Sequence, residues 1–202
     1  MLRYFKLVAA AAALTAAPLQ SAIADGPPAN WEASIDEAVL PELGRVLAEP
    51  IVAFAIKAQN ARYTGLAQAD IDALDAQWRK EHETEAQPLI SAILSNPVSS
   101  YLTRVQAQSI GLYTEIFVMD DNGLNVGQSN ISSDFWQGDE AKWQKTFQVG
   151  PRAIFIDEPE FREDVGIWVV QVNLAIDAAD AAIGAATFEI NLTELDRRRP
   201  KG

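Results

Sequence analysis

Cysteine is missing from this chain of 202 residues, and histidine occurs once. The absence of cysteine excludes disulfides, zinc–thiolate sites, thiol nucleophiles and a lipoprotein anchor. The one histidine, His82, lies in a polar helical stretch among glutamates, and no glycine-framed serine occurs elsewhere. A hydrolytic triad therefore has no support, and we expect His82 to be a solvated surface residue.

Positive charge is scarce, with 16 basic against 28 acidic residues and a net charge of −12. A nucleic-acid-binding surface needs the opposite balance, so nucleic acid is not an expected partner. Glycines are too scattered for a phosphate-binding loop, which leaves nucleotide hydrolysis without support. The Asp120–Gly123 segment resembles the start of a calcium loop, but its glycine comes too early and a hairpin turn explains it. We expect no metal and no cofactor.

Long hydrophobic runs are also missing after the first two dozen residues. The N-terminus combines Arg3 and Lys6 with an apolar run over 7–17 and an Ala22–Ala24 cleavage motif, as in a secretory signal peptide over 1–24. The alternative, an uncleaved anchor, is less favoured because a spanning helix needs about 20 apolar residues. We expect cleavage between Ala24 and Asp25, a periplasmic or secreted product, and no membrane span thereafter.

The chain divides near residue 111 into a helical region, 25–110, and a strand-rich region, 111–202, which we expect to form one globular unit. Asn96 precedes Pro97, the typical combination of an N-cap and a first-turn proline, and predicts a helix from residue 97. An earlier amphipathic helix is predicted by apolar residues three and four positions apart: Ile71, Leu74 and Trp78.

Strand formers with a period of two dominate after residue 112, and Asn122-Gly123 marks a tight hairpin. The predicted strands are 113–118, 124–129, 153–157, 167–174 and 183–192, with a short helix over 139–147. This order predicts an α+β fold in which a five-stranded antiparallel sheet packs against helices. The side chains predicted to form its core are Ile116, Val118, Ile154, Ile156, Val170, Val172 and Ile190.

Together these segments resemble the extracytoplasmic PAS-like sensor family known as PDC or single Cache domains, over residues 95–195. The resemblance is carried by YTEIFVMDDNG, SNISSDFWQGDEAKWQ, IFID, VQVNLAID and IGAATFEIN, in that order after a long helical region. It implies a PAS-like sheet with a pocket for a small molecule, usually a carboxylate, an amino acid or a related metabolite. Such domains are normally fused to a kinase, chemoreceptor or cyclase. Here the resemblance implies a free-standing periplasmic module that works with a separate membrane-bound sensor kinase, cyclase or chemoreceptor.

The segment from Ser129 to Trp143 mixes aromatic and polar side chains as a small-ligand site does. We select Ser129, Asp134, Trp136 and Trp143 from it as candidate ligand-binding residues, with the alternative that both tryptophans fill the core. In double-domain relatives the corresponding stretch carries arginines that hold a ligand carboxylate. Asp139 and Ala141 stand at those positions, which argues against carboxylate capture by that route.

Asp157, at the end of IFID, matches a position where the family commonly places an acid that meets a ligand amine. The alternative is that Asp157 caps the bend at Glu158-Pro159. Most of the hydrophobic residues of the predicted strand 167–174 share one face, and Gln171 lies on the other, which faces either solvent or the pocket. With Glu189 also near, the acidic surroundings favour an amine-bearing ligand, and we take Asp157 and Gln171 as further candidates.

The run Arg197–Lys201 opposes the acidic character of the chain. We expect a frayed, solvated tail, with weak contact to anionic lipid or an acidic partner as the alternative. Three function classes stay open: a periplasmic ligand-binding sensor module, which is favoured; a non-catalytic interaction protein that uses the fold without a ligand; and an enzyme, which lacks an evident nucleophile and base, although carboxylate-pair chemistry stays open.

Overall fold

A computed structural model gives the structure of residues 26–199. The predicted signal peptide and its cleavage site lie outside the described residues, as do the last three residues. Within 26–199, none of the helices combines the length and apolar character needed to cross a membrane.

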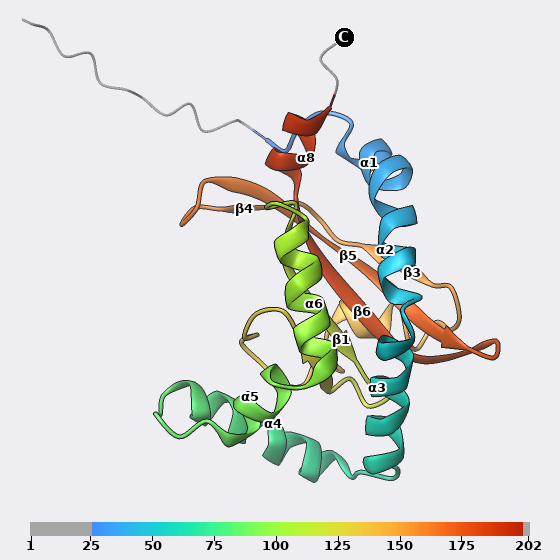
Figure 1. Cartoon of the computed structure of the whole chain (residues 1–202), viewed down its shortest axis with the longest axis vertical. Helices are drawn as coiled ribbons and strands as arrows, with labels where there is room; N and C mark the ends of the chain where they lie inside the picture. The colour runs from blue at the N-terminus through green and yellow to red at the C-terminus, as the bar shows by residue number, and fades with distance from the viewer. Residues whose placement is uncertain (1–25, 200–202) are drawn as a thin grey trace, which may run out of the picture.

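Helices make up the first half of the described chain, and α1, α2 and α3 follow one another down one side of the molecule (Figure 1). Their bounds are α1 (Trp31–Ser34), a π-helical stretch η1 (Ile35–Val39), α2 (Leu40–Leu47), α3 (Pro50–Arg62), α4 (Gln68–His82), α5 (Pro88–Leu94) and α6 (Pro97–Gln108). The predicted cap of α6 is confirmed, because the Asn96 side chain accepts a hydrogen bond from the Ser99 amide at 2.8 Å. Proline opens α3, α5 and α6, where its missing N–H costs no helical hydrogen bond.

The second half forms an antiparallel sheet, which confirms the predicted α+β class. Its elements are β1 (Tyr113–Met119), β2 (Asn125–Gln128), α7 (Ala141–Gln144), β3 (Ile154–Ile156), β4 (Glu160–Arg162), β5 (Ile167–Ala178), β6 (Ala181–Asn191) and α8 (Leu192–Arg198). The strand order is β2-β1-β6-β5-β3, and β4 pairs with β5 beside β3. All of the pairings among these strands are antiparallel.

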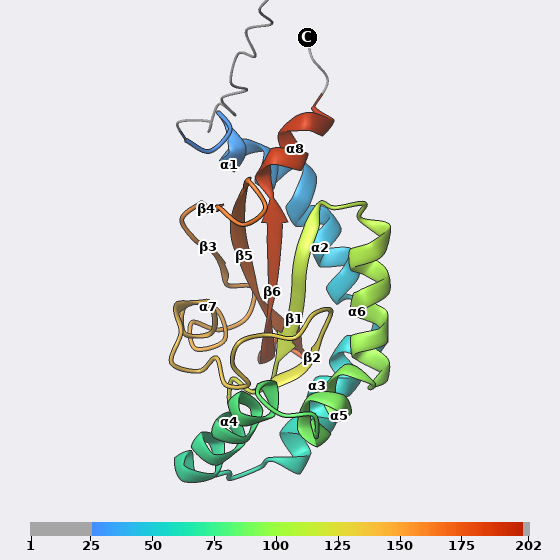
Figure 2. The same ribbon diagram turned by 90° about the vertical axis from the view of Figure 1, so that its left-hand side faces the viewer.

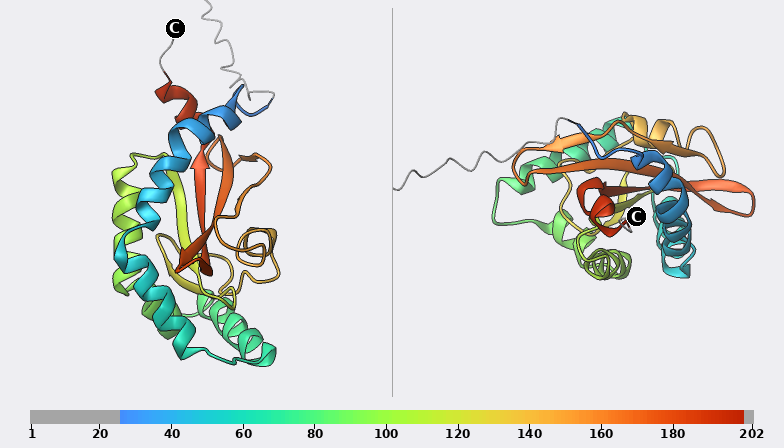
Figure 3. Two further views of the ribbon diagram at one scale, coloured as in Figure 1. Left: turned by 90° about the vertical axis from the view of Figure 1, so that its right-hand side faces the viewer. Right: turned by 90° about the horizontal axis from the view of Figure 1, so that it is seen from above.

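The sheet has a helical face and an opposite face. Helices α2, α3 and α6 cover one face, while the segment between β2 and β3 lies on the other (Figures 2 and 3). The core against the helices includes the predicted Ile116, Val118, Val170, Val172 and Ile190, all buried. Because successive strand residues point to opposite sides, their neighbours face away from the helices, toward what is here called the open face.

Helices α4 and α5 form a second, smaller core below the sheet. Ile71 and Trp78 of α4 pack there with Ile90 and Ile93 of α5 and with Phe135. The Trp78 and Phe135 rings stack at a centroid distance of 5.2 Å. This packing fixes the segment after β2 against α4, and that segment forms one wall of the site described below.

Three elements differ from the predictions. The segment between the predicted strands 153–157 and 167–174 contains β4, so the sheet has six strands rather than five. Ile154 is 49% exposed because it lies on edge strand β3, and Ile156 is only partly buried, so their prediction as full core residues was wrong. Helix α7 is shorter than predicted, since the Thr146 hydroxyl donates to the Lys142 carbonyl that a longer helix would use.

The predicted frayed tail is instead helix α8 and the residue after it. Arg197 and Arg198 both pair with Glu194, at 2.6 and 2.8 Å. Arg198 also donates to the carbonyl of Ser109 at the end of α6, and Arg199 donates to the carbonyl of Ala29 before α1. These bonds join α8 to α6 and to the start of the described chain, so the arginines up to Arg199 are not a loose basic tail.

Candidate functional site

Two pockets open side by side on the open face and share the side chain of Glu189. The larger, here called the wide pocket, has a volume of about 530 Å³ and lies between loop 130–133, Arg162, Val165 and the sheet. The smaller, here called the narrow pocket, has a volume of about 230 Å³ and lies between α7, segment 157–160 and β5. Their common wall makes them one cleft with two compartments.

Two carboxylates face each other on the floor of this cleft. Glu115 of β1 and Glu189 of β6 are directly paired across the antiparallel ladder. Each alternates with a core residue of its own strand, so both side chains lie on the open face. Glu189 is 8% exposed, and its Oε1 accepts a hydrogen bond from the Thr114 hydroxyl at 2.6 Å. Burial, and then the neighbouring Glu189 carboxylate, raise the pKa of Glu115 to about 7.

Two cationic side chains border the carboxylates. Arg162, on β4, reaches Glu189 with an Nη1–Oε1 distance of 3.4 Å, and its Nε lies 3.3 Å from Asp164. Lys142, on α7, pairs with Glu140 at 2.8 Å. Both cations are thus already engaged by acids of the protein. The two pockets together are lined by six carboxylates, from Glu115, Glu140, Asp157, Glu158, Glu160 and Glu189, against these two cations.

A layer of buried polar side chains continues the open face beyond the cleft. Asn173 and Thr187, on neighbouring strands, are fully buried and hydrogen-bonded to each other at 2.7 Å. Asn125 and Gln128 of β2 are also fully buried, and both bond to the hydroxyl of Ser132, which lines the wide pocket. Within the described residues, Asn125 Oδ1 and Gln128 Nε2 have no hydrogen-bond partner. Such atoms are costly to bury, so a polar layer ending at a cleft is typical of a site that receives water or a ligand.

Asp157 and Gln171 are the two sequence-predicted residues that line the narrow pocket. They are held together because the Asp157 amide donates to the Gln171 carbonyl at 3.0 Å, which extends the β3–β5 ladder by one residue. The Asp157 carboxylate also accepts from the Glu158 amide at 2.9 Å. Asp157 therefore both lines the pocket and caps the following bend, so the two interpretations of this residue are compatible.

The two tryptophans lie apart from this pocket and are held by the protein itself. Trp143 is buried against Phe117 and stacks on Phe147, and its indole N–H donates to the Asp120 carbonyl at 3.1 Å. The Trp136 indole donates to the Asn122 carbonyl at 2.9 Å. Each indole N–H needs a buried acceptor, and the β1–β2 turn supplies both. Neither tryptophan is therefore among the residues that line the pocket with Asp157.

Asp134 and Ser129 are likewise placed by contacts within the protein. The Asp134 carboxylate lies 4.0 Å from Arg79 of α4, and its carbonyl accepts from Ser132 Oγ at 2.6 Å. The Ser129 hydroxyl accepts from the Ile116 amide at 2.9 Å, which extends the β1–β2 pairing. Neither is among the residues that line the two pockets. Ligand contact by these residues and by the tryptophans stays a prediction.

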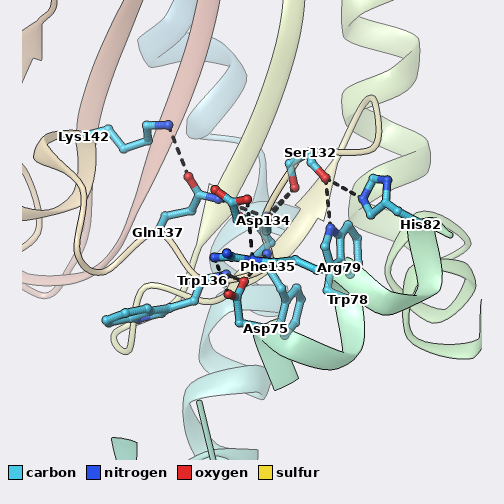
Figure 4. A network of polar contacts seen from close by, with 11 residues as sticks. Asp75, Trp78, Arg79, His82, Ser132, Asp134, Phe135, Trp136, Gln137 and Lys142 are labelled. Atoms are coloured by element: carbon cyan, nitrogen blue, oxygen red, sulfur yellow. Dashed lines mark hydrogen bonds and ion pairs between the residues drawn. The ribbon is translucent and has the colours of Figure 1, made fainter. Parts of the chain in front are cut away.

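Helix α4 holds the wall of the wide pocket from behind (Figure 4). Asp75 accepts hydrogen bonds from the amides of Phe135 and Trp136 at 2.9 and 3.1 Å and pairs with Arg79 at 2.6 Å. The Ser132 carbonyl lies 2.9 Å from the Trp78 indole nitrogen and 3.0 Å from His82 Nε2. His82 is exposed as predicted, but it contacts this loop. The rigid contacts to α4 keep Ser132 at the edge of the cleft.

The residues that sequence reasoning missed are Glu115 and Arg162. Glu115 had a detectable signal, because a charged residue inside a strongly hydrophobic strand points to a polar face. Arg162 had none, since it lies in a charged segment that gave no strand pattern. Among residues 26–199 no three acidic or histidine side chains are grouped so that they could hold a metal ion. The chemistry that this arrangement offers is recognition of a cation by partly buried carboxylates.

No family model matches the chain, and no curated protein matches it. Solved structures do resemble it. The sensory domain of the Campylobacter jejuni chemoreceptor Tlp3 is 16% identical, with a TM-score of 0.40 over 84% of this chain and 68% of that one. The sensor domain of the Vibrio cholerae histidine kinase DctB is 14% identical, with a TM-score of 0.36 over 84% and 61%. The ligand-binding domain of the Pseudomonas aeruginosa amino acid chemoreceptor PctC, in complex with GABA, is 12% identical, with a TM-score of 0.36 over 62% of each chain.

Proposed function

We propose that this protein is a small-molecule-binding sensor module that acts outside the cytoplasm and holds its ligand in the two-compartment cleft on the open face. The observation that carries the proposal is the buried carboxylate of Glu189, shared by both pockets and faced by Glu115. Burying charge is unfavourable unless it is compensated, so two facing carboxylates on a sheet are retained where they recognise something. A sheet face that served core packing alone would instead carry apolar side chains, as the helix-covered face does.

The ligand in this proposal carries an amine. An ammonium group placed between carboxylates in a partly buried cleft makes charge-assisted hydrogen bonds that are stronger than in water. Asp157 and Gln171 serve as polar contacts in the narrow compartment, where both line the wall. In this proposal the cleft binds its ligand and does not convert it.

The signal passes, in this proposal, to a membrane-bound sensor kinase, cyclase or chemoreceptor encoded separately. The secretory signal over 1–24 directs the protein to the periplasm, where small metabolites reach it directly. The segment between β2 and β3 touches both the cleft and α4. Ligand-dependent shifts in that segment would therefore reach the outer surface of α4, where a partner can bind.

Native mass spectrometry of the protein purified from the periplasm of its source organism tests this function. We expect a co-purifying small molecule, whose mass identifies the ligand. The variant Asp157→Asn should lose most of this adduct, whereas Asp70→Asn, an exposed carboxylate at the start of α4, should keep it. An adduct-free protein whose melting temperature does not respond to periplasmic extract would contradict a ligand-binding function and favour an interaction protein.

A further inference from the structure

We infer that the wide pocket selects organic cations that have an apolar body and no carboxylate, and that Arg162 occupies the cation position until such a ligand displaces it. The inference rests on the proposed ligand-binding function and specifies its ligand class and its regulation. Three features support it: Arg162 is held weakly, the lining of the two pockets is mainly negatively charged, and the rim of the wide pocket carries exposed apolar side chains.

Arg162 is held weakly enough to be displaced. Its contact with Glu189 is one long ion pair of 3.4 Å, and its side chain is 42% exposed. On its other side it meets Asp164, which is 63% exposed, so the guanidinium keeps a partner after leaving Glu189. Half-exposed ion pairs of this kind contribute little stability. The strand that carries Arg162 is three residues long and pairs with β5 alone among the described strands, so few hydrogen bonds oppose its movement.

Glu189, in contrast, is fixed. It is 8% exposed, Thr114 holds its Oε1 at 2.6 Å, and Glu115 lies directly across the ladder. A ligand ammonium that enters the wide pocket meets the carboxylates of Glu115 and Glu189 at once, whereas Arg162 is hydrogen-bonded to only one of these two, Glu189. The exchange replaces one guanidinium–carboxylate contact by an ammonium between two carboxylates. The net charge of the cleft is unchanged, and no covalent bond forms or breaks.

The charge of the lining disfavours a ligand carboxylate. Six carboxylates surround the two compartments, and the two cations among them already pair with Glu140, Glu189 and Asp164. A zwitterion would have to bring its carboxylate into this field without a free cation to receive it. Like charges at such distances repel, so removing the carboxylate from the ligand strengthens binding.

The rim supplies the apolar part of the site. Ile131 and Val165 line the wide pocket from opposite segments, the loop after β2 and the β4–β5 turn, and they are 44% and 60% exposed. Because these apolar side chains are exposed at the edge of a polar cleft, the hydrocarbon part of a ligand can be buried against them. Ile167 continues the same wall. A ligand with an ammonium at Glu115 and Glu189 would place its hydrocarbon part between these side chains.

Three probes that share one body separate the charges: phenethylamine carries the ammonium alone, phenylalanine both charges, and 3-phenylpropanoate the carboxylate alone. Their binding to the full secreted protein is measured by calorimetry and by NMR titration. We expect phenethylamine to bind at least tenfold more tightly than phenylalanine, and 3-phenylpropanoate not to bind. Arg162→Gln should tighten phenethylamine binding at least threefold, while Arg104→Gln, on α6 across the sheet, should leave it unchanged. Amide exchange over residues 160–166 should accelerate when phenethylamine binds to the wild type.

Other outcomes overturn the inference and leave the proposed function distinguishable from it. If phenylalanine binds as tightly as phenethylamine and Arg162→Gln weakens it, Arg162 anchors a ligand carboxylate, and the protein is still a ligand-binding module. If none of the three probes shifts the resonances of Glu115 or Glu189, the cation position is refuted. The adduct seen by native mass spectrometry then decides separately whether the cleft binds another class of molecule.

Discussion

The carboxylate of Glu115 should lower the stability of the folded protein at neutral and alkaline pH. Burial beside Glu189 raises its pKa from the ordinary 4.5 to about 7. The folded state therefore binds a proton more strongly than the unfolded state does between these values, and stability falls as the pH rises through this interval. At roughly 1.36 kcal/mol per pH unit, the difference amounts to about 3 kcal/mol at pH 8. Glu115→Gln removes the charge and keeps the size, so the variant should be more stable by about this amount at pH 8.

Urea unfolding followed by circular dichroism at pH 4.5 and at pH 8 measures this effect as the difference between variant and wild type. The difference should be close to zero at pH 4.5, where Glu115 is protonated in the folded state, and should reach its full value at pH 8. In a thermal melt at pH 8 the gain corresponds to about 6–12 °C for a chain of this size. Glu85→Gln, an exposed carboxylate between α4 and α5, should change neither value. A variant that is equal to or less stable than the wild type at pH 8 would refute the argument that Glu115 is ionised at a cost.

Three further predictions concern the site, the core and a turn. Asp157→Asn should weaken ligand binding by about tenfold or more. Its melting temperature should hardly change, since the asparagine oxygen can still cap the Glu158 amide. Calorimetry with the ligand identified by mass spectrometry measures the affinity, and an unchanged affinity would remove Asp157 from the site. Ile116→Ala should lower the free energy of unfolding in urea by about 2–4 kcal/mol, because the Ile116 side chain is fully buried. Ile154→Ala should lower it by less than about 1 kcal/mol, because Ile154 is 49% exposed. Equal losses would show that the sheet faces are assigned wrongly. Ala179→Gly should stabilise the protein by up to about 1 kcal/mol, because Ala179 has a φ of 51° in the β5–β6 turn and glycine adopts this left-handed conformation without strain. Urea unfolding measures the change. A less stable variant would show that this turn does not strain the alanine.

The elements predicted well were those whose signals are local. The Asn96 cap, the Asn122-Gly123 hairpin and the core face of β5 each depend on residues within a few positions of one another. Such signals need no knowledge of which strand lies beside which. They therefore gave the order of the elements and the main core of the fold.

The site was predicted less well because it depends on pairing between distant segments. Glu115 and Glu189 become neighbours through the β1–β6 ladder, and no pattern within β1 names its partner. The tryptophans were selected for their residue type, but an indole N–H binds whichever buried carbonyl is near, and here that is the β1–β2 turn. Asp157 and Gln171 both line the narrow pocket because the end of β3 pairs with β5, and their contact with a ligand stays a prediction.

The bonds that fix α8 differ in how they respond to sequence change. The acceptors at Ala29, Ser109 and Ile110 are main-chain carbonyl oxygens, which every amino acid possesses. Substitutions at these three positions can therefore accumulate over evolutionary time without removing an acceptor, provided that the backbone path is kept. Arg198 and Arg199 have no such freedom, because a lysine cannot reproduce the forked guanidinium of Arg198, whose Nε donates to Glu194 while its Nη2 donates to two carbonyls. Among distant versions of this chain, the donors of this junction should thus vary far less than its acceptors.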